Sequence, residues 1–267
     1  MKKIIFIIII IFVSIFLYGK YIEVNNFKIK EYTISSEFIP ESFKELKIIH
    51  FSDILYKAND NIKMLENIKD EINNENPDII IFSGDLFSKG EKYTEDDISK
   101  ITNILKDMKS SLFKFAVIGD NDQKYIDTYK DVLYESEFTL LDNENKLLFY
   151  KDSTPINIIG LTNLENISTL FEADVEYNYT LAIIHEPDYL EDLSKYEIDT
   201  VLSGHSLGGI INMPFYGGII TKDGARTYIN DQYNLDNTNI FISNGIGYEK
   251  YNFRLFNTPS INSYRFK

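Results

Sequence analysis

The stretch Ile79-Ile80-Ile81-Phe82-Ser83-Gly84-Asp85 decides the fold class of this 267-residue chain. Four consecutive large apolar residues are typical of a strand that is buried on both faces, as in a sheet covered by helices. Pro77 before the run and Gly84 after it limit the element to the length of a strand. Asp85 therefore follows the carboxyl end of a buried strand, which is where open α/β sheets bind their ligands.

Four other apolar runs end in the same way, at a side chain that can bind a metal ion. These side chains are Asp53 after 47–52, Asp120 after 115–119, His185 after 181–184 and His205 after 200–204. Because ligands of α/β sheets lie beyond the carboxyl ends of several strands, we expect these residues to converge with Asp85. A single Asp at a strand end is often only a turn residue, so it is the repetition of the pattern that predicts a metal site.

The spacing of apolar residues predicts alternating strands and helices, followed by a strand-rich last third. Helices are expected at 61–73, 94–105, 125–136 and 187–196, with a helical patch after Leu161. Strands are expected at 27–35, 46–51, 79–83, 114–118, 138–141, 146–150, 156–161, 180–185, 199–203, 217–221, 226–230, 239–243, 253–257 and 260–266. This order predicts an α/β fold of two stacked sheets with helices outside. The sequence has no internal repeat or linker after the first 20 residues, which predicts one domain over residues 21–267.

The composition limits the classes of partner. The net charge of -14 and the pI near 4.7 argue against a nucleic-acid-binding surface, because duplex binding needs clustered Lys and Arg. The sequence has no cysteine, which excludes disulfides, thiolate metal ligands and a cysteine nucleophile. Apolar residues make up 44% of the chain, which is enough for the core of one large domain.

Residues 1–20 predict a membrane segment. Lys2 and Lys3 precede an almost unbroken apolar run over residues 4–18, which is apolar on every face and unlike a helix packed on one side of a domain. A signal segment and a short anchor both fit, and the lack of small residues in Leu17-Tyr18-Gly19 favours an uncleaved anchor. By the positive-inside rule the lysines place the N-terminus in the cytoplasm, so we expect the domain at the cell membrane, facing outside the cytoplasm.

Five motifs along the chain resemble those of the calcineurin-like metallophosphoesterases. They are Ser52-Asp53-Ile54-Leu55, Ser83-Gly84-Asp85-Leu86, Gly119-Asp120-Asn121-Asp122, His185-Glu186-Pro187 and Ser203-Gly204-His205-Ser206-Leu207-Gly208-Gly209. The family patterns read, in the same order, S-D-x-H, G-D, G-N-H-D, H-x-P and G-H-T-H-G-G. The segments 213–215, 242–247 and 253–259, together with the N-terminal anchor, resemble the membrane-anchored bacterial branch of that family.

The resemblance implies a four-layer αββα sandwich that hydrolyses phosphate monoesters or diesters with two metal ions. Two neighbouring ions stabilise both the attacking and the leaving oxygen of an in-line displacement. Carried over position by position, the resemblance implies that Asp85 bridges the metals and that Asp120, His185 and His205 complete the second-metal site. Asp120 stands where the family has Asn, a change that keeps an oxygen ligand and adds a negative charge.

Three departures from the family pattern affect one side of this site. The family's first metal takes the Asp and His of the first motif and the second His of the fifth, which correspond here to Asp53, Leu55 and Leu207. Leucine offers no ligand atom, so Asp53 and Asp85 are left to hold at most a weakly bound, hydrated ion such as Mg²⁺. Asn121 replaces the family's catalytic His, and a neutral amide cannot protonate a leaving group.

These departures predict one firmly bound divalent metal, either Mn, Zn or Fe, and a second ion that is weak or absent. Two functions stay open. One is a hydrolase with weak or altered activity; the other is a noncatalytic relative that binds a phosphorylated small molecule, lipid or envelope ligand at the cell surface. A purely structural protein without metal is disfavoured by the retained second-metal donors. We expect Asp122 to support the loop of Asn121 without binding metal, and His50 to be a hydrogen-bonded core residue.

Overall fold

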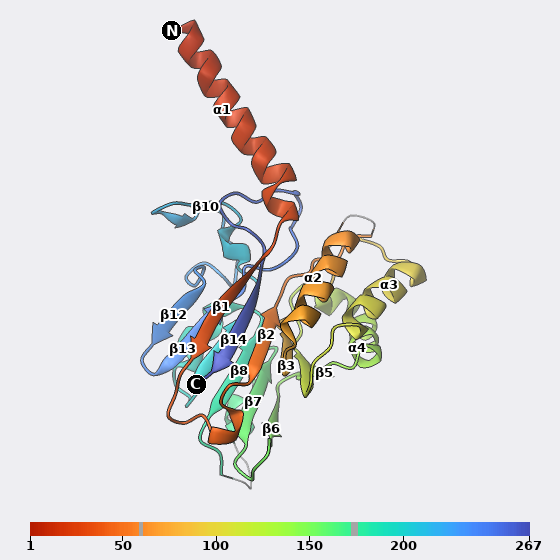
Figure 1. Ribbon diagram of the computed structural model, residues 1–267, viewed down its shortest axis with the longest axis vertical. Helices are drawn as coiled ribbons and strands as arrows, with labels where there is room; N and C mark the ends of the chain where they lie inside the picture. Colours follow the sequence, from red (N-terminus) through yellow and green to blue (C-terminus); the bar gives the residue numbers. More distant parts are fainter. Residues whose placement is uncertain (59–60, 172–175) are drawn as a thin grey trace.

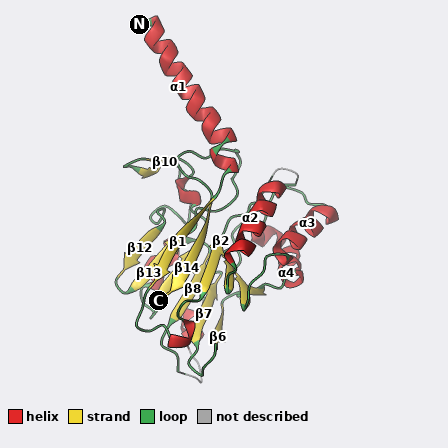
Figure 2. Ribbon diagram, viewed as in Figure 1, coloured by secondary structure: helices red, strands yellow, loops and turns green. Residues whose placement is uncertain are grey.

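The computed structural model describes residues 1–58, 61–171 and 176–267. An α/β domain carries an N-terminal helix that projects away from it (Figure 1). Among the described residues the domain contains two six-stranded sheets and a small hairpin formed by β10 (Asn212–Met213) and β11 (Gly217–Gly218). The two mixed sheets, with helices on the outside, confirm the predicted fold class (Figure 2).

The first sheet has the strand order β1-β14-β2-β3-β4-β5. Its strands are β1 (Lys28–Ile34), β14 (Ser260–Phe266), β2 (Lys47–Phe51), β3 (Ile79–Phe82), β4 (Phe113–Ala116) and β5 (Thr139–Leu140). The four strands from β2 to β5 run parallel, whereas β14 is antiparallel to β2 and parallel to β1. The carboxyl ends of β2, β3 and β4 therefore lie at one edge of the sheet.

The second sheet has the strand order β12-β13-β9-β8-β7-β6. Its strands are β12 (Gln232–Leu235), β13 (Thr238–Ile242), β9 (Thr200–Ser203), β8 (Thr180–Ile184), β7 (Ile156–Leu161) and β6 (Glu144–Leu148). The strands β13, β9, β8 and β7 are parallel, and antiparallel strands close both sides of the sheet. Here too, the carboxyl ends of the central strands share one edge.

Among the described residues, three apolar clusters hold the layers together. The first joins the outer face of the first sheet to α2 (Ile62–Glu75), α3 (Glu95–Lys106) and α4 (Ile126–Glu135). The second lies between the sheets, and includes Ile81 of β3 and Leu202 of β9. The third packs the second sheet against η4 (Ile167–Phe171), η5 (Pro187–Tyr189) and α5 (Leu190–Leu193). Because each fully buried Leu, Ile or Phe contributes about 1.5–3 kcal/mol, these clusters fix the position of the strand ends. Further 3-10 turns are η2 (Glu41–Phe43), η3 (Asp122–Tyr125) and η6 (Leu207–Gly209).

Helix α1 (Lys2–Tyr21) leaves the domain with its side chains exposed as far as Tyr18, which excludes a helix buried in the domain core. The helix is long and apolar enough to cross a membrane, and a signal sequence has the same length and composition. Its carboxyl end is attached to the domain: the Phe16 ring stacks on that of Phe253 at 5.6 Å between centroids. In η1 (Glu23–Asn25), the buried carboxylate of Glu23 accepts two backbone hydrogen bonds from the tail of the chain, at 2.7 and 2.8 Å.

Two of the predicted strands are wrong, and in both cases backbone donors are bound by other groups. In residues 226–230, three successive N–H groups donate to the carboxylate of Asp188 at 2.7–3.2 Å. In residues 253–257, N–H groups donate to the carbonyl of Gly19 and to the carboxylate of Glu23. In the described part of the chain 226–230 forms no strand, and 253–257 pairs only at Leu255, through an isolated bridge to Ile211. The predicted helix at 187–196 is also too long, because α5 ends at Leu193.

Candidate metal centre

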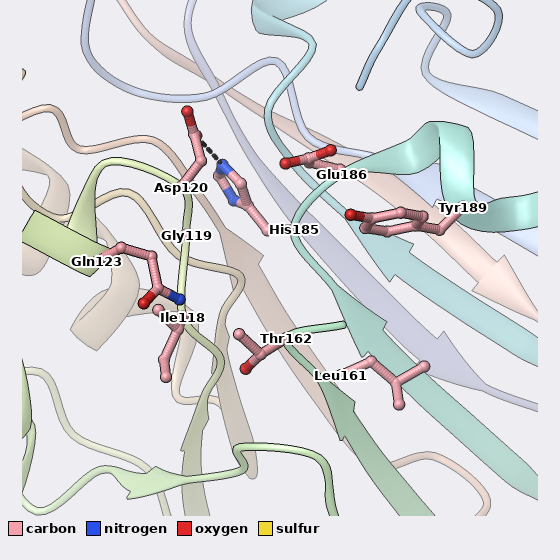
Figure 3. Close-up of a pocket in the computed structure, with 9 residues that line it drawn as sticks. All are labelled: Ile118, Gly119, Asp120, Gln123, Leu161, Thr162, His185, Glu186 and Tyr189. Atoms are coloured by element: carbon pink, nitrogen blue, oxygen red, sulfur yellow. Dashed lines mark ion pairs between the residues drawn. The ribbon is translucent and has the colours of Figure 1, made fainter. Parts of the chain in front are cut away.

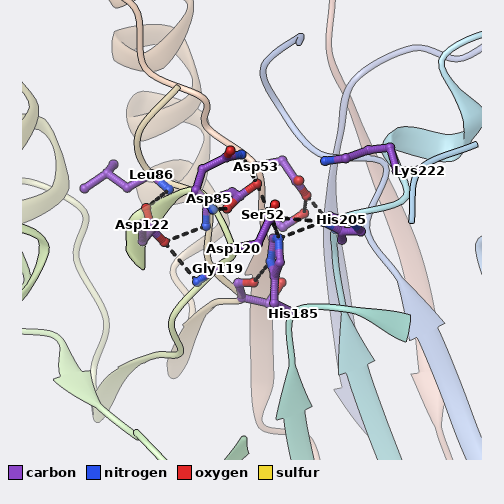
Figure 4. A network of polar contacts seen from close by, with 12 residues as sticks. Ser52, Asp53, Asp85, Leu86, Gly119, Asp120, Asp122, His185, His205 and Lys222 are labelled. Atoms are coloured by element: carbon purple, nitrogen blue, oxygen red, sulfur yellow. Dashed lines mark hydrogen bonds and ion pairs between the residues drawn. The ribbon is translucent and has the colours of Figure 1, made fainter. Parts of the chain in front are cut away.

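All five predicted ligands lie just beyond strand ends, at the edge shared by the two sheets (Figure 4). Asp53, Asp85 and Asp120 follow β2, β3 and β4 of the first sheet, while His185 and His205 follow β8 and β9 of the second. Four of these residues are buried, and each places one ligand atom within 4.8 Å of the others. The exception is Asp120, which is partly exposed but contacts both imidazole rings.

The two imidazoles and Asp120 form the tightest part of the cluster. The Nε2 atom of His185 lies 3.0 Å from Nδ1 of His205, and Oδ1 of Asp120 lies 3.2 Å from each of these nitrogens. The remaining ring nitrogens each contact a backbone carbonyl at 2.7 Å, that of Ser83 for His185 and that of Asp223 for His205. Such contacts orient a ring and leave its other nitrogen free for a ligand.

The spacing of these donors suits a single metal ion. Ligand atoms about 2.1 Å from one ion lie roughly 3.0–3.4 Å from each other. The contacts among His185, His205 and Asp120 measure 3.0–3.2 Å, and Oδ2 of Asp85 lies 3.3 Å from Nε2 of His185. Two imidazole nitrogens and two carboxylate oxygens form a donor set that Zn²⁺, Mn²⁺ and Fe²⁺ accept. The residues present therefore fit a divalent metal.

The charges of the carboxylates act strongly on this cluster. Burial alone would lower the pKa of His185, but the charge of Asp85 and the contacts with Asp120 and Asp85 raise that pKa well above its ordinary value. Burial alone would raise the pKa of Asp120, but hydrogen bonds from His185 and His205 hold it well below its ordinary range. The arrangement thus favours a positive charge between the carboxylates.

The backbone of the cluster is strained. Asp53, Asp85 and His205 have φ angles of +49°, +62° and +63°. Residues other than glycine rarely adopt this left-handed region, and each instance costs on the order of 1–3 kcal/mol. Such strain persists where the surrounding structure imposes it, as it does at many functional sites. Gly119 allows the close approach of two of these loops, because a Cβ atom there would clash with the backbone nitrogen of Asp85.

On the side of Asp53, leucines occupy the two positions where the family has histidine ligands, 55 and 207. Oδ2 of Asp53 accepts hydrogen bonds from Ser52 Oγ at 2.5 Å and from the backbone N–H of His205 at 2.9 Å. Its Oδ1 atom is buried and has no hydrogen-bond partner within the described part of the chain. An unsatisfied buried oxygen costs about 1–3 kcal/mol, so this carboxylate fits a bound cation. Leu55 and Leu207 are both 1% exposed and present only hydrocarbon.

The structure directs Asn121 toward Asp85. Its backbone N–H donates to Oδ1 of Asp85 at 2.9 Å and its side-chain amide donates to Oδ2 at 2.6 Å. Asp122 accepts hydrogen bonds from four backbone N–H groups, at 2.8–3.2 Å, in the loops that follow β3 and β4. Burial and the charge of Asp85 raise the pKa of Asp122 to about 8, against the effect of these N–H groups. Both residues hold the Asp85 loop in place.

His50 lies in the core, as predicted. It is fully buried, and its Nε2 atom lies 2.8 Å from Ser83 Oγ while Nδ1 lies 3.3 Å from the Tyr264 hydroxyl. Burial lowers the pKa of His50 to about 3, so the ring is neutral at physiological pH.

Sequence reasoning missed Lys222, which lies in the segment between β11 and β12. Its largely buried ammonium forms an ion pair with Glu249 at 2.8 Å and points toward the carboxylates of the cluster (Figure 4). Burial alone would lower the pKa of Lys222, but the charges of Asp53, Asp85 and Glu249 raise it. A positive side chain therefore lies on the side of the cluster where metal ligands are missing. No motif or periodicity in the sequence marks this lysine.

A cavity of about 220 Å³ opens beside His185 (Figure 3). Asp120 and His185 form its wall next to the cluster, and Leu161, Thr162 and Tyr189 lie among the residues of the remaining wall. The cavity is smaller than the roughly 300–1,000 Å³ of pockets that enclose a drug-sized ligand, and suits a small polar group.

A family model supports the resemblance seen in the motifs. The model described as calcineurin-like phosphoesterase matches residues 46–209, a range that contains all five motifs and every predicted site residue. The chain belongs to this family. The chain is 28% identical over 256 residues to the uncharacterized metallophosphoesterase YkuE of Bacillus subtilis strain 168, and the match covers 94% of this chain and 89% of the relative.

A second relative of the chain has a named activity. The UDP-2,3-diacylglucosamine pyrophosphatase LpxG of Chlamydia muridarum is 23% identical over 229 residues, covering 66% of this chain and 69% of the relative. Among solved structures, a dimetal phosphatase from Danio rerio matches 76% of this chain and 88% of its own, with a TM-score of 0.45 and 9% identity.

Proposed function

We propose that this protein is a membrane-anchored phosphoric ester hydrolase that works with one firmly bound divalent metal. The observation that carries the proposal is the convergence of Asp85, Asp120, His185 and His205, with contacts of 3.0–3.3 Å among their ligand atoms. A bound metal supplies positive charge to phosphoryl oxygens and lowers the pKa of water, the two contributions that phosphate ester hydrolysis needs.

Lys222 replaces part of the charge that a first metal would supply. Its ammonium approaches from the side of Asp53, where Leu55 and Leu207 leave no other cation ligand. A lysine binds phosphate as a point charge, so Lys222 neutralises a phosphoryl oxygen on the side opposite the imidazoles. In this arrangement the substrate phosphate lies between the metal ligands and Lys222.

The chemistry of Asn121 limits the leaving group. Asn121 is neutral, and its backbone N–H and one side-chain N–H are bound to Asp85, so it neither protonates a leaving oxygen nor replaces the family's His. General acid catalysis is worth about 10²- to 10⁴-fold, and its loss slows esters of ordinary alcohols most. The site is therefore suited to leaving groups that are stable as anions, such as the phosphate released from a phosphoanhydride. The pyrophosphatase name of the LpxG relative agrees with this substrate class.

The N-terminal helix sets the location in this proposal. Lys2 and Lys3 retain the N-terminus in the cytoplasm, α1 crosses the membrane, and the domain over residues 21–267 faces outside the cytoplasm. The substrates within reach are then phosphorylated lipids and envelope components. The net charge of -14 disfavours nucleic acid as a substrate.

The test uses the purified full chain in detergent, with elemental analysis and Mn²⁺-supplemented assays on bis(p-nitrophenyl) phosphate, an alkyl diester and inorganic pyrophosphate. We expect about one tightly bound metal, turnover of the activated diester and of pyrophosphate, and little turnover of the alkyl diester. His205→Ala should lose both metal and turnover, whereas Glu135→Gln, an exposed change on α4, should lose neither.

Two results would contradict the proposal. Two tightly bound metals with rapid alkyl diester hydrolysis would show that the first-metal site is intact. Bound metal without turnover of any substrate would favour the noncatalytic binding protein, for which the replacements Leu55, Leu207 and Asn121 are the supporting observation.

A further inference from the structure

Large apolar side chains are exposed at the end of the domain from which α1 emerges. We call this set the apolar rim; it comprises Met213, Phe215, Tyr216, Ile219, Ile220, Tyr251 and Phe256. Phe215 is fully exposed and Tyr216 is 92% exposed, at the tip of the β10–β11 hairpin. Contiguous exposed apolar side chains of this size mark a surface that contacts a partner or a membrane.

Backbone contacts join the rim to α1. The N–H of Arg254 donates to the carbonyl of Gly19 in α1 at 3.3 Å. The next residue, Leu255, bonds the start of the hairpin: its carbonyl accepts from Asn212 at 2.9 Å and its N–H donates to Ile210 at 3.1 Å. Figure 1 places β10 at the same end of the domain as the base of α1. The rim is therefore continuous with the surface of the helix that can cross a membrane.

The same segment also forms a wall of the candidate metal centre. Ile220 lies two residues before Lys222, and the carbonyl of Asp223 contacts Nε2 of His205 at 2.7 Å. The rim and the metal-ligand cluster are thus connected by one short segment of the chain, residues 220–223.

The chemistry of the rim suits a bilayer interface better than a protein surface. Its side chains are aromatic or aliphatic, and Lys250 lies over the ring of Tyr251 at 5.4 Å. At the end of α1, Lys20 lies over the ring of Tyr21 at 5.2 Å. Tyrosines and lysines together are typical of the boundary between lipid chains and water. With a net charge of -14, the chain has no general attraction to anionic lipid, so apolar insertion would carry the contact.

We propose that the apolar rim inserts into the interface of the bilayer that α1 crosses, and that the site takes an amphipathic phosphoric ester or anhydride held in that leaflet. The insertion follows from the rim and from its continuity with α1, and it rests on the proposal that α1 crosses the membrane. The substrate class rests in addition on the proposed function.

The insertion is testable because the chain contains no tryptophan. Phe215→Trp in the full chain, placed in phosphatidylcholine nanodiscs, should lose at least about half of its emission when the acyl chains are brominated. Tyr134→Trp, at an 85% exposed position on α4, is the matched control and should not be quenched. Equal emission of Phe215→Trp with and without bromine would overturn the insertion. Emission that instead depends on the number of chains per nanodisc would show that the rim contacts a second copy of the chain. This result would also overturn the proposed insertion.

The substrate class needs a separate measurement. Phe215→Ser combined with Tyr216→Ser should reduce turnover of hexadecyl pyrophosphate in the same nanodiscs by about tenfold, and leave bis(p-nitrophenyl) phosphate turnover unchanged. Equal loss with both substrates, or no loss with either, would refute a lipid substrate delivered over the rim. If the unmodified chain hydrolyses neither, the proposed function and the substrate class both fail, while the quenching result still decides the insertion.

Discussion

Nε2 of His185 faces Nδ1 of His205 at 3.0 Å, at the ends of the neighbouring parallel strands β8 and β9. Both rings also contact Asp120, which follows a strand of the other sheet, at 3.2 Å. A cation bound among these three residues would connect the edges of the two sheets. Metal binding should therefore be visible in the stability of the whole domain and not only in catalysis.

We expect Mn²⁺ or Zn²⁺ to stabilise the protein and EDTA to remove that stabilisation. A ligand at about 100 times its dissociation constant adds about 2.7 kcal/mol to the free energy of unfolding. Urea unfolding of the full chain in detergent, with metal and with EDTA, measures the difference. His205→Ala should abolish the stabilisation by metal, and Glu135→Gln should retain it. If metal stabilises His205→Ala as much as the unmodified chain, the metal binds elsewhere.

Lys222→Met should weaken binding of inorganic phosphate by about tenfold or more, because it removes a buried positive charge next to Asp53 and Asp85. Lys222→Arg keeps the charge and should retain most of the affinity. The inhibition constant of phosphate against bis(p-nitrophenyl) phosphate turnover is the measurement. If the Met and Arg variants bind phosphate equally well, Lys222 has only a structural role through its ion pair with Glu249.

The combined change Leu55→His, Asn121→His and Leu207→His should raise both the metal stoichiometry and the rate on alkyl diesters. It restores two imidazole ligands beside the unpaired Oδ1 of Asp53, and a proton donor at position 121. The ammonium of Lys222 would still repel an added cation, so adding Lys222→Met should raise the stoichiometry further. Unchanged metal content in both variants would show that the backbone at these positions no longer presents a ligand toward Asp53.

The strands that carry the ligands were predictable because each is an apolar run buried on both faces and ends at a turn. Lys222 was not predictable, because one lysine in a turn-rich segment forms no sequence pattern. The position of its side chain depends on how residues 219–225 fold over the cluster. The segment 253–257 has the pattern of a strand in sequence, yet the N–H groups of Arg254, Phe256 and Asn257 are bound by Gly19 and Glu23, more than 200 residues earlier. A contact of that separation leaves no local signal.

His50 predicts a specific loss of stability in acid. Burial holds its folded-state pKa at about 3, whereas the pKa in the unfolded chain is the ordinary 6.5. Between these values the unfolded state binds one more proton than the folded state. The contribution of His50 to stability is therefore complete above pH 6.5 and falls by about 1.4 kcal/mol per pH unit as the pH drops toward 3. His50→Gln keeps a polar side chain for Ser83 and Tyr264 without titrating, and every other group is common to both chains. Urea unfolding at pH 7, 6 and 5 should thus give a steeper loss for the unmodified chain, and parallel curves would mean that His50 is solvated or protonated in the folded protein.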